Sequence, residues 1–582
     1  MPSSRMIHYH VAFENPLTFY LQLQMTFEVP AAAAEALELQ LPAWRPGRYE
    51  LQNFAQKIQR VVVEDAASGE KLSFRKLTKD RWQIAGAAGR TVRVSYNFYA
   101  HQMDAGGSWL DETQLYLNPI QACMYLEGRQ QEVCELTLAL PENWQIACGL
   151  PQSAPNTLRA RGFEELVDCP LIASPTLVQH AYEAQGLPFY IWVQGECAPD
   201  WSRLLRDFKA FTEEQLALFG SFPVTDYHFL NQILPYKHYH GVEHSNSTVI
   251  VLGPAELLMT EALYKELLGV SCHELFHTWN IKQIRPAEMM PYDYTRENYF
   301  RTCYIAEGIT TYYGEYLLAR AGVRTAEQYF QELNIVLRKH YDDYGRFHLS
   351  LADASVDLWL DGYKPGVPDR KVSVYHKGAL VALLLDLTLR RLSHHERSLD
   401  DVMRRLWLEF GQPGLGYTEE DYIRLVNEVA GRDMQTYFDK FVYGTAPLEE
   451  PLNKALELVG CGLLTQESFS ASESLFGFRV IARNERTEVT DILPGTPAAA
   501  TLTVDDEIIA VNGRKVAMNL QTLLDDGAPS YQLSVFRQNR LLTVTLTANA
   551  EQRYWQKITV EKRPDATPEQ RASFRQWLKQ DF

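Results

Sequence analysis

Two histidines and a glutamate within five consecutive residues are the strongest chemical signal in the sequence. They form the run His273-Glu274-Leu275-Phe276-His277. In a helix, residues four apart project from one face, so both imidazoles can bind one metal ion, and Glu274 can act as general base on its water. The good helix formers from Thr260 to Leu268 favour such a helix. The alternative is a buried core histidine, but we predict a zinc-dependent peptidase site.

A third protein ligand is needed, because a catalytic zinc keeps its fourth position for water. Two glutamates compete for this role. Glu297 lies nearer to His277, at close to the interval of thermolysin-like enzymes, but an exposed charge beside Arg296 is the simpler interpretation. Glu307 lies further along and precedes glycine in Ala306-Glu307-Gly308. We expect Glu307 to be the ligand, since a glutamate before glycine on a facing helix is the commoner setting in aminopeptidase-type zinc enzymes.

Length and composition indicate a multidomain globular protein. A chain of 582 residues exceeds one hydrophobic core, so roughly two to four domains are expected. A net charge of −17 argues against a nucleic-acid partner, because phosphate binding needs a basic face. The eight cysteines are scattered without a CxxC pair, which favours free buried thiols. Apolar runs long enough for a signal peptide or a membrane span are absent, so we expect a cytoplasmic protein without membrane insertion.

Four regions follow one another along the chain. Residues 1–170 alternate in short apolar and polar runs between turn residues, which predicts an antiparallel β-domain. Residues 171–455 carry helical periodicity and predict a mostly helical catalytic domain. Residues 456–552 predict a compact β-rich module with an Asn-Gly turn. Residues 553–582 form an extension that ends in a short amphipathic helix. The predicted fold class is therefore multidomain α+β.

Several separated motifs resemble those of the glycyl aminopeptidase family of zinc metallopeptidases, peptidase family M61. They are Leu41-Pro42-Ala43-Trp44-Arg45-Pro46-Gly47-Arg48-Tyr49 with Asn53-Phe54-Ala55, Gly241-Val242-Glu243-His244, His273 to Lys282 with Arg285-Pro286, and Glu307 to Tyr313. The resemblance covers nearly the whole chain. It implies a thermolysin-like catalytic domain of the gluzincin type, one Zn²⁺ per chain on His273, His277 and Glu307, and a C-terminal PDZ domain. One departure is Cys303-Tyr304, where the family commonly has Leu-Trp; it would change the packing beside the site.

The same resemblance assigns substrate-binding roles. Glu243 would pair with the free α-amine of a peptide, since its setting resembles the Gly-x-Met-Glu-Asn strand of aminopeptidases; the alternative is an isolated exposed glutamate. Gly241 and His244 flank it and would contribute to substrate binding. Tyr375 would donate a hydrogen bond to the oxyanion, with His376 as the weaker candidate. The alternative for Tyr375 is a core aromatic at the start of a helix.

The module near the C-terminus has a motif of its own. Leu475-Phe476-Gly477-Phe478 resembles the carboxylate-binding loop of PDZ domains, in which backbone N–H groups hold a peptide C-terminus. A C-terminal peptide in this groove is therefore one possible partner. The equal alternative is a groove filled from within, so that the module only braces the catalytic domain.

Three functions remain open at this stage. The family resemblance implies an aminopeptidase that removes small N-terminal residues, Gly or Ala, from peptides with a free N-terminus. The same zinc site could instead serve an endopeptidase in which Glu243 does not anchor an amine. A PDZ-based adaptor with vestigial catalysis is disfavoured, because the complete set of zinc ligands and general base is present.

Overall fold

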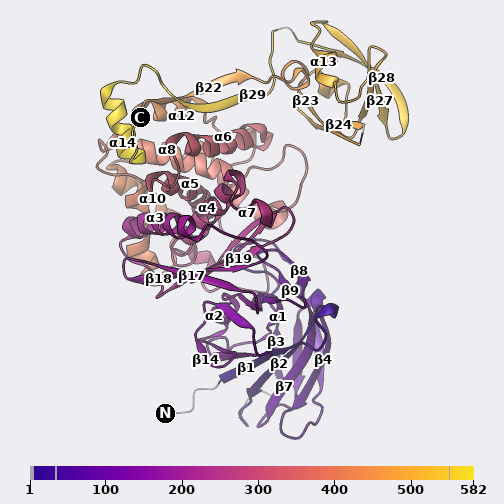
Figure 1. Cartoon of the computed structure of the whole chain (residues 1–582), viewed down its shortest axis with the longest axis vertical. Coiled ribbons are helices and arrows are strands. Elements are labelled where there is room, and N and C mark those ends of the chain that lie inside the picture. Colours follow the sequence, from indigo (N-terminus) through magenta and orange to yellow (C-terminus); the bar gives the residue numbers. More distant parts are fainter. Residues whose placement is uncertain (1–5, 33–35, 485, 550) are drawn as a thin grey trace.

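The chain folds into three parts arranged along an elongated body (Figure 1). The computed structural model describes residues 6–32, 36–484, 486–549 and 551–582. The N-terminal β-domain lies at one end, the helical domain occupies the middle, and the C-terminal module projects to one side. Within the described residues, none of the helices combines the length and apolar character needed to cross a bilayer.

The N-terminal domain is built from three β-sheets, as the alternating sequence pattern predicts. In β7 (Thr91–Tyr99), for example, every second side chain is buried. Its strands pair antiparallel except for β1 and β12, which run parallel. The largest sheet has the order β14 (Gln152–Ala154), β15 (Thr157–Ala160), β12 (Val133–Leu138), β1 (Met6–Ala12), β2 (Tyr20–Glu28), β7, β4 (Ile58–Asp65). A second sheet has the order β11 (Tyr125–Leu126), β3 (Ala36–Gln40), β6 (Arg81–Ala85), β5 (Phe74–Thr78). The third has the order β13 (Gln145–Cys148), β16 (Leu171–Ser174), β10 (Leu115–Leu117), β9 (Ser108–Leu110), β8 (His101–Gln102).

The catalytic domain begins with a sheet that helical periodicity did not predict. Its order is β17 (Val178–Ala184), β18 (Leu187–Gln194), β19 (Tyr227–Ile233), β21 (Ser247–Gly253) and β20 (His238–Glu243). The three central strands are parallel, and β20 pairs antiparallel at the edge. Both β19 and β21 are buried along their whole length, so neither shows the alternation that marks a half-exposed strand.

Helices fill the rest of this domain. α4 (Glu261–Phe276) lies between the sheet and α5, and it is buried on most sides. The side chain of Thr260 caps its N-terminus by accepting a hydrogen bond from Leu263 N. The remaining helices are α3 (Trp201–Phe219), α5 (Thr310–Arg320), α6 (Ala326–Asp342), α7 (Leu351–Asp361), α8 (His376–Leu392), α9 (Leu399–Leu406), α10 (Glu419–Ala430), α11 (Gln435–Phe441) and α12 (Glu449–Leu456).

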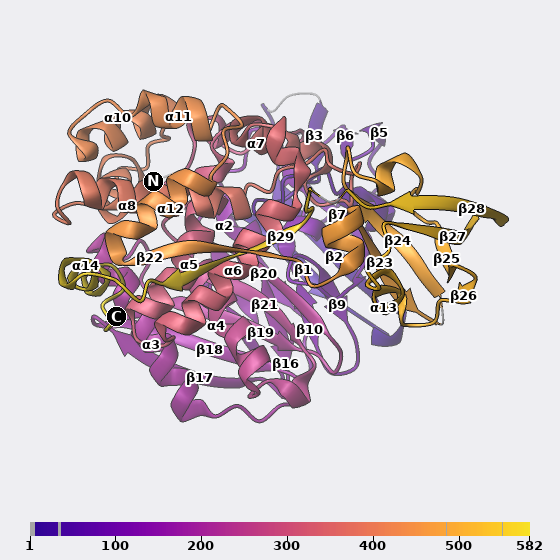
Figure 2. The same ribbon diagram turned by 90° about the horizontal axis from the view of Figure 1, so that it is seen from above.

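The C-terminal module is inserted between two strands of one ribbon. β22 (Cys461–Glu467) pairs antiparallel with β29 (Gln556–Lys562), and the module's sheet lies between them in the chain. That sheet has the order β23 (Phe478–Arg483), β24 (Arg486–Ile492), β25 (Glu507–Val511), β27 (Ser530–Arg537) and β28 (Arg540–Thr547), with α13 (Leu520–Leu524) beside it. Figure 2 shows the ribbon running from the helical domain to the module.

The predicted terminal helix is α14 (Pro568–Leu578), and it returns to the catalytic domain. Its Trp577 is fully buried, and the Trp577 carbonyl accepts a hydrogen bond of 2.7 Å from the Tyr316 hydroxyl. Residues that follow the module in sequence therefore belong, in packing, to the helical body. This return anchors both ends of the ribbon that carries the module.

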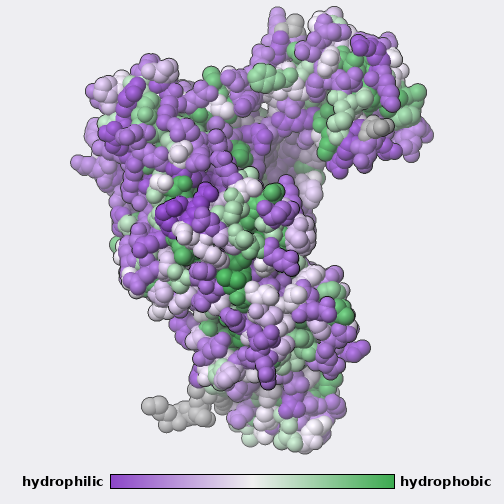
Figure 3. Space-filling model, viewed as in Figure 1, coloured by the Kyte–Doolittle hydropathy of each residue, from purple (hydrophilic) through white to green (hydrophobic). Residues whose placement is uncertain are grey.

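A cavity of about 870 Å³ separates the module from the helical body. It lies between α6 and the ribbon, and Figure 3 shows the hollow from outside. One bridge crosses this region: Arg479 of β23 makes a two-pronged ion pair with Asp342 at the end of α6, at 2.9 and 3.0 Å. The Arg479 guanidinium also lies 4.3 Å from the centre of the Trp555 ring. The module thus has a defined orientation over the body.

A buried polar group joins the N-terminal and catalytic domains. The carboxylate of Asp168 accepts hydrogen bonds from Lys282 Nζ at 2.7 Å and from the Ser245 hydroxyl and backbone N–H at 2.6 and 3.0 Å. Lys282 is only 3% exposed. The buried ammonium therefore depends on this one carboxylate for its neutralising charge.

We predict that Asp168→Asn strongly destabilises the protein, because it leaves Lys282 buried without a counter-charge. The cost should be about 3–5 kcal/mol. Burial alone would raise the pKa of Asp168, but Lys282 and His244 hold it below its ordinary value. Its contribution is therefore present above about pH 4, the unfolded pKa, and is lost as the pH falls through the lower folded pKa. Calorimetry across pH should show a shallower acid-side loss in the variant.

The exposed pair of Glu64 and Lys71 supplies the matched control for this measurement. Lys71 is 69% exposed, so solvent screens the pair and Glu64→Gln should change stability little. Equal effects of the two substitutions would contradict the role assigned to Asp168.

Candidate active site

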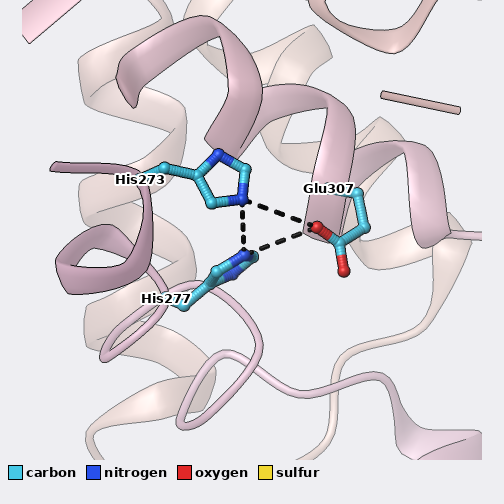
Figure 4. A group of neighbouring side chains, drawn as sticks. All are labelled: His273, His277 and Glu307. Atoms are coloured by element: carbon cyan, nitrogen blue, oxygen red, sulfur yellow. Dashed lines mark hydrogen bonds and ion pairs between the residues drawn. The ribbon is translucent and has the colours of Figure 1, made fainter. Parts of the chain in front are cut away.

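Three side chains converge in the centre of the helical domain (Figure 4). The Nε2 atoms of His273 and His277 lie 3.0 Å apart. Glu307 Oε2 lies 3.9 Å from the first and 3.4 Å from the second. His273 comes from the last turn of α4, His277 caps this helix, and Glu307 comes from the facing segment. Two imidazoles and one carboxylate at such distances are a donor set suited to Zn²⁺.

A hydrogen bond on the side of the ring away from the cluster fixes the orientation of His277. Its Nδ1 lies 2.8 Å from the carbonyl oxygen of Asn280. Since a carbonyl only accepts, Nδ1 carries a proton, and Nε2 is the ring nitrogen that faces the cluster. The Asn280 side chain donates in turn to the carbonyl of Ile305 at 2.8 Å, within the segment that carries Glu307. Sequence reasoning did not single out Asn280, although it lies within the His273–Lys282 motif.

Glu307 stands in a π-helical turn, η5 (Tyr304–Ile309), directly before α5. Single π-turns often occur at functional sites, where they change the direction of one side chain. Gly308 allows this turn to lie against α8, since a Cβ atom there would come within 2.6 Å of Gly378 Cα. The close packing of η5 against α8 therefore explains why a glycine follows Glu307.

Two further carboxylates lie beside the triad. Oxygen atoms of Glu243 and Glu274 fall within 4.8 Å of one another and of His277. Each carboxylate is 5% exposed, and Glu243 Oε1 and Glu274 Oε2 have no hydrogen-bond partner within the described part of the chain. Glu243 ends the edge strand β20, which lies against α4. Gly241 in this strand makes room for Glu274, because a Cβ atom there would overlap the Glu274 carboxylate.

The charges of this cluster favour a cation. Burial raises the pKa of Glu274; Glu243 and Glu307 raise it further, against the opposing effect of His277. Burial alone would lower the pKa of His277, but Glu307 and the other carboxylates raise it to about 10. Three buried carboxylates thus act on one point, and a divalent cation there would offset the cost of burying them. The residues present fit zinc.

Tyr375 lies next to the third candidate ligand. It precedes α8, and it is one of the groups that act on the Glu307 carboxylate and on Tyr363, so its side chain lies near both. His376 instead lines the cavity beside α6. Of the two candidate donors, Tyr375 is therefore the one that reaches the cluster. Tyr363 was not expected from the sequence, where it stands in no motif.

His244 and Glu297 lie outside the cluster. The His244 ring is buried, with Nδ1 at 3.3 Å from the Asp168 carboxylate. It therefore belongs to the link between the domains rather than facing the triad. Glu297 is absent from the metal-binding groups found among the described residues, whereas Glu307 is present.

The N-terminal domain contributes to the site, which sequence reasoning missed. Gly47 has a φ of +80°, and a Cβ atom there would overlap the Glu243 carboxylate. Two residues later, Tyr49 is buried, and Glu307 and Glu243 both act on its hydroxyl. The signal existed in the Leu41–Tyr49 motif, but nothing in the sequence indicates that this motif reaches a strand nearly 200 residues away.

The PDZ-like loop contains a left-handed turn at Gly477. Gly477 adopts a φ of +75°, and its carbonyl accepts a hydrogen bond from Leu493 N at 2.9 Å. Leu475 and Phe476 precede it in a π-helical turn, η9 (Ser472–Phe476), and Phe478 opens β23. Within the described residues, β23 pairs with β24 only and so forms an edge of the sheet.

Comparisons with known proteins agree with this architecture. The family models of the Peptidase M61 N-terminal domain, the M61 glycyl aminopeptidase and the PDZ domain match residues 8–175, 266–381 and 466–522. A crystal structure of an aminopeptidase N family protein from Idiomarina loihiensis is 27% identical, with a TM-score of 0.89, over 98% of this chain and 100% of that one. An M1 zinc metallopeptidase from Deinococcus radiodurans is 15% identical, with a TM-score of 0.45, over 76% of this chain and 94% of the other. None of the curated proteins matches significantly.

The fold and the site together define a zinc metallopeptidase with a C-terminal PDZ domain. Both M61 family models match in the expected order, followed by the PDZ model. The predicted resemblance to the M61 family and the predicted fold class are thereby confirmed.

We predict that Gly241→Ala impairs turnover without loss of metal. The new methyl group would displace the Glu274 carboxylate, and a misplacement of about 1 Å can cost about 100-fold in rate. Metal analysis and kcat/KM on a glycyl reporter substrate measure the two effects separately. Gly308→Ala is the matched comparison, since it should push η5 away from α8 and reduce metal content as well. Full activity of Gly241→Ala would refute the proposed contact.

Proposed function

We propose that the protein is a zinc-dependent aminopeptidase that removes small N-terminal residues, glycine or alanine, from peptides. One Zn²⁺ would be held by His273, His277 and Glu307. The observation that carries the proposal is Glu243, a buried carboxylate beside Glu274 and His277 whose Oε1 has no partner among the described residues. A free α-amine is the charge that distinguishes a peptide terminus from the interior of a chain, and Glu243 supplies its counter-charge.

The edge strand β20 supports this arrangement. Because β20 lies at the border of the sheet, an extended peptide can add to it through backbone hydrogen bonds. Glu243 is the last residue of β20, so the peptide would meet the carboxylate at its N-terminal end. Beyond Glu243, the turn at Gly47 occupies the space. This geometry suits the removal of one residue at a time.

The chemistry would be divided among three side chains. Zinc bound at the triad would polarise the scissile carbonyl and make a water molecule more acidic. Glu274 takes the proton from the attacking water and then delivers it to the leaving amine. Tyr375, held beside Glu307, donates a hydrogen bond to the oxygen that gains negative charge.

We predict that Glu274→Gln lowers kcat by about 10²–10⁴-fold while the protein keeps its metal, because the amide cannot accept the proton. Hydrolysis of glycyl and alanyl reporter substrates measures the loss. Chelation of the wild-type protein should abolish activity, and added Zn²⁺ should restore it. Normal turnover by Glu274→Gln would sink the mechanism.

We also predict that acetylation of the substrate N-terminus removes most activity, since the amide no longer pairs with Glu243. Loss of one partner of a buried charge pair costs about 2–5 kcal/mol, so Glu243→Gln should lower kcat/KM on free peptides by about 30- to several thousand-fold. The same substitution should leave the residual rate on acetylated peptides nearly unchanged. If the wild-type protein cleaves free and acetylated peptides equally well, it is an endopeptidase at the same zinc site.

A second binding function is proposed for the PDZ domain. The free edge of β23 and the Gly477 turn together suit a peptide C-terminus, which would add as a further strand. Such a site would recruit substrates or partners to the enzyme. An adaptor without catalysis is disfavoured by the assembled cluster of metal ligands and Glu274.

A further inference from the structure

Lys377, the second residue of α8, has a buried ammonium group without a hydrogen-bond partner. The residue is 2% exposed, and its Nζ atom has no partner among the described residues. Burial lowers the pKa of Lys377 to about 8, and Asp343 opposes this effect only in part. Lys282, which is similarly buried, instead has the Asp168 carboxylate at 2.7 Å. A buried ammonium without such a partner costs stability unless a negative charge comes from elsewhere.

A small cavity lies at Lys377 and has room for one small ligand. Its volume is about 10 Å³, and its lining includes Lys377, His340, Arg346 and residues 445–449. A cavity of this size can hold one particle as large as a water molecule. A sulfate or phosphate group, with five heavy atoms, would not fit. A ligand at this place is therefore a water molecule or a single-atom ion.

The N-terminus of α12 reaches the same cavity through residues 445–449. α12 begins at Glu449, and Leu448 at the N-cap position provides no side-chain hydrogen bond to the first turn. The first N–H groups of a helix and its dipole both favour a negative charge. The helix therefore adds positive potential to a cavity that already contains the Lys377 ammonium.

The charged side chains of the lining do not neutralise this ammonium. Glu449 is the one carboxylate among them, and it is the first of the charged groups that raise the pKa of Arg346 against the effect of burial. Its charge is thus matched by Arg346. His340 is neutral near pH 7, because burial lowers its pKa to about 3. Among the described residues of the lining, the Lys377 ammonium and the α12 N-terminus are left without an anion.

We propose that this cavity is a halide-binding site, occupied by chloride in solution and formed by Lys377 Nζ and the first N–H groups of α12. A halide only accepts hydrogen bonds, which suits an ammonium and helix N–H groups, since both only donate. The ion neutralises Lys377 and links the start of α8 to the start of α12. Tyr375 stands two residues before Lys377, so the ion also steadies the segment that carries the proposed oxyanion donor. The site goes beyond the proposed peptidase function and does not rest on it.

Thermal unfolding of the metal-loaded protein tests the site, in sodium chloride and in sodium gluconate of equal ionic strength. Gluconate is too large for the cavity. Chloride should therefore raise Tm saturably, by about 1–4 °C at 100 times its Kd. Lys377→Met keeps the length of the side chain and removes its charge. This variant should lose the chloride response, and in gluconate it should be at least as stable as the wild type, because no unpaired charge is buried.

Lys339→Met is the matched control, since it removes the same charge from an exposed position on α6. Its Tm should respond to chloride as the wild type does. A chloride response of equal size in Lys377→Met and Lys339→Met would overturn the proposal, because screening of surface charge would then explain it. No difference between chloride and gluconate in the wild type would overturn it as well.

Bromide supplies a direct readout, because it is close to chloride in size and scatters anomalously. A crystal soaked in bromide should show an anomalous peak beside Lys377 Nζ, and the peak should be absent from Lys377→Met. The competing occupant is a water molecule that bridges Lys377 to Glu449 Oε2, which also has no partner among the described residues. A cavity that holds water only would overturn the proposal. A bromide peak without a chloride response in solution would overturn it too, as binding at crystal concentration only. If Lys377→Met does not fold, the bromide peak and the wild-type chloride response decide.

Discussion

The structure depends on three carboxylates buried together. Glu243, Glu274 and Glu307 lie around His277 with little or no exposure to solvent. Burying one ionised carboxylate is costly, and a group of three is tolerated only with a compensating positive charge. The raised pKa of His277 shows how strongly this point attracts such a charge. A divalent cation on the triad, with an ammonium at Glu243, would supply it. Under the proposed function, stability of the centre and recognition of the substrate would therefore have one electrostatic cause.

The N-terminal domain contributes residues directly to this centre. It holds the catalytic domain through the buried Asp168–Lys282 pair and reaches the carboxylates through Gly47. Its β-sheets give the connecting turn a rigid base, which a free loop would lack. The two domains are thus joined beside the cluster of carboxylates, and their buried residues form one continuous core. A shift between them would move Gly47 away from Glu243.

The PDZ domain is attached differently. A two-stranded ribbon carries it, α14 returns to the body, and Arg479 ties β23 to α6. The ion pair lies on the strand whose free edge suits a peptide, so peptide binding and domain orientation share one element. The neighbouring cavity of about 870 Å³ also reaches His376, the residue after Tyr375. This places the module's attachment close to the segment that carries the proposed oxyanion donor.

Much of the site could be predicted from local spacing. His273, Glu274 and His277 are one turn apart, and helical geometry alone brings them to one face. The alternating pattern likewise predicted the β-domain, and Thr567 with its following residues predicted α14. Glu307 was preferred over Glu297 because of its glycine, and the contact of Gly308 with Gly378 supplies the physical reason. The buried strands β19 and β21 escaped prediction because both of their faces are apolar.

Tertiary structure decided the rest. It turned His244 towards Asp168, placed Tyr375 near Glu307, and brought Gly47 from another domain against Glu243. These contacts link segments that are distant in sequence, and no periodicity encodes them, because they arise from how whole domains pack. The sequence by itself determined the metal-binding helix, whose geometry is local. Only the packing of the two domains brought Gly47 against Glu243, because that contact joins segments far apart in the sequence.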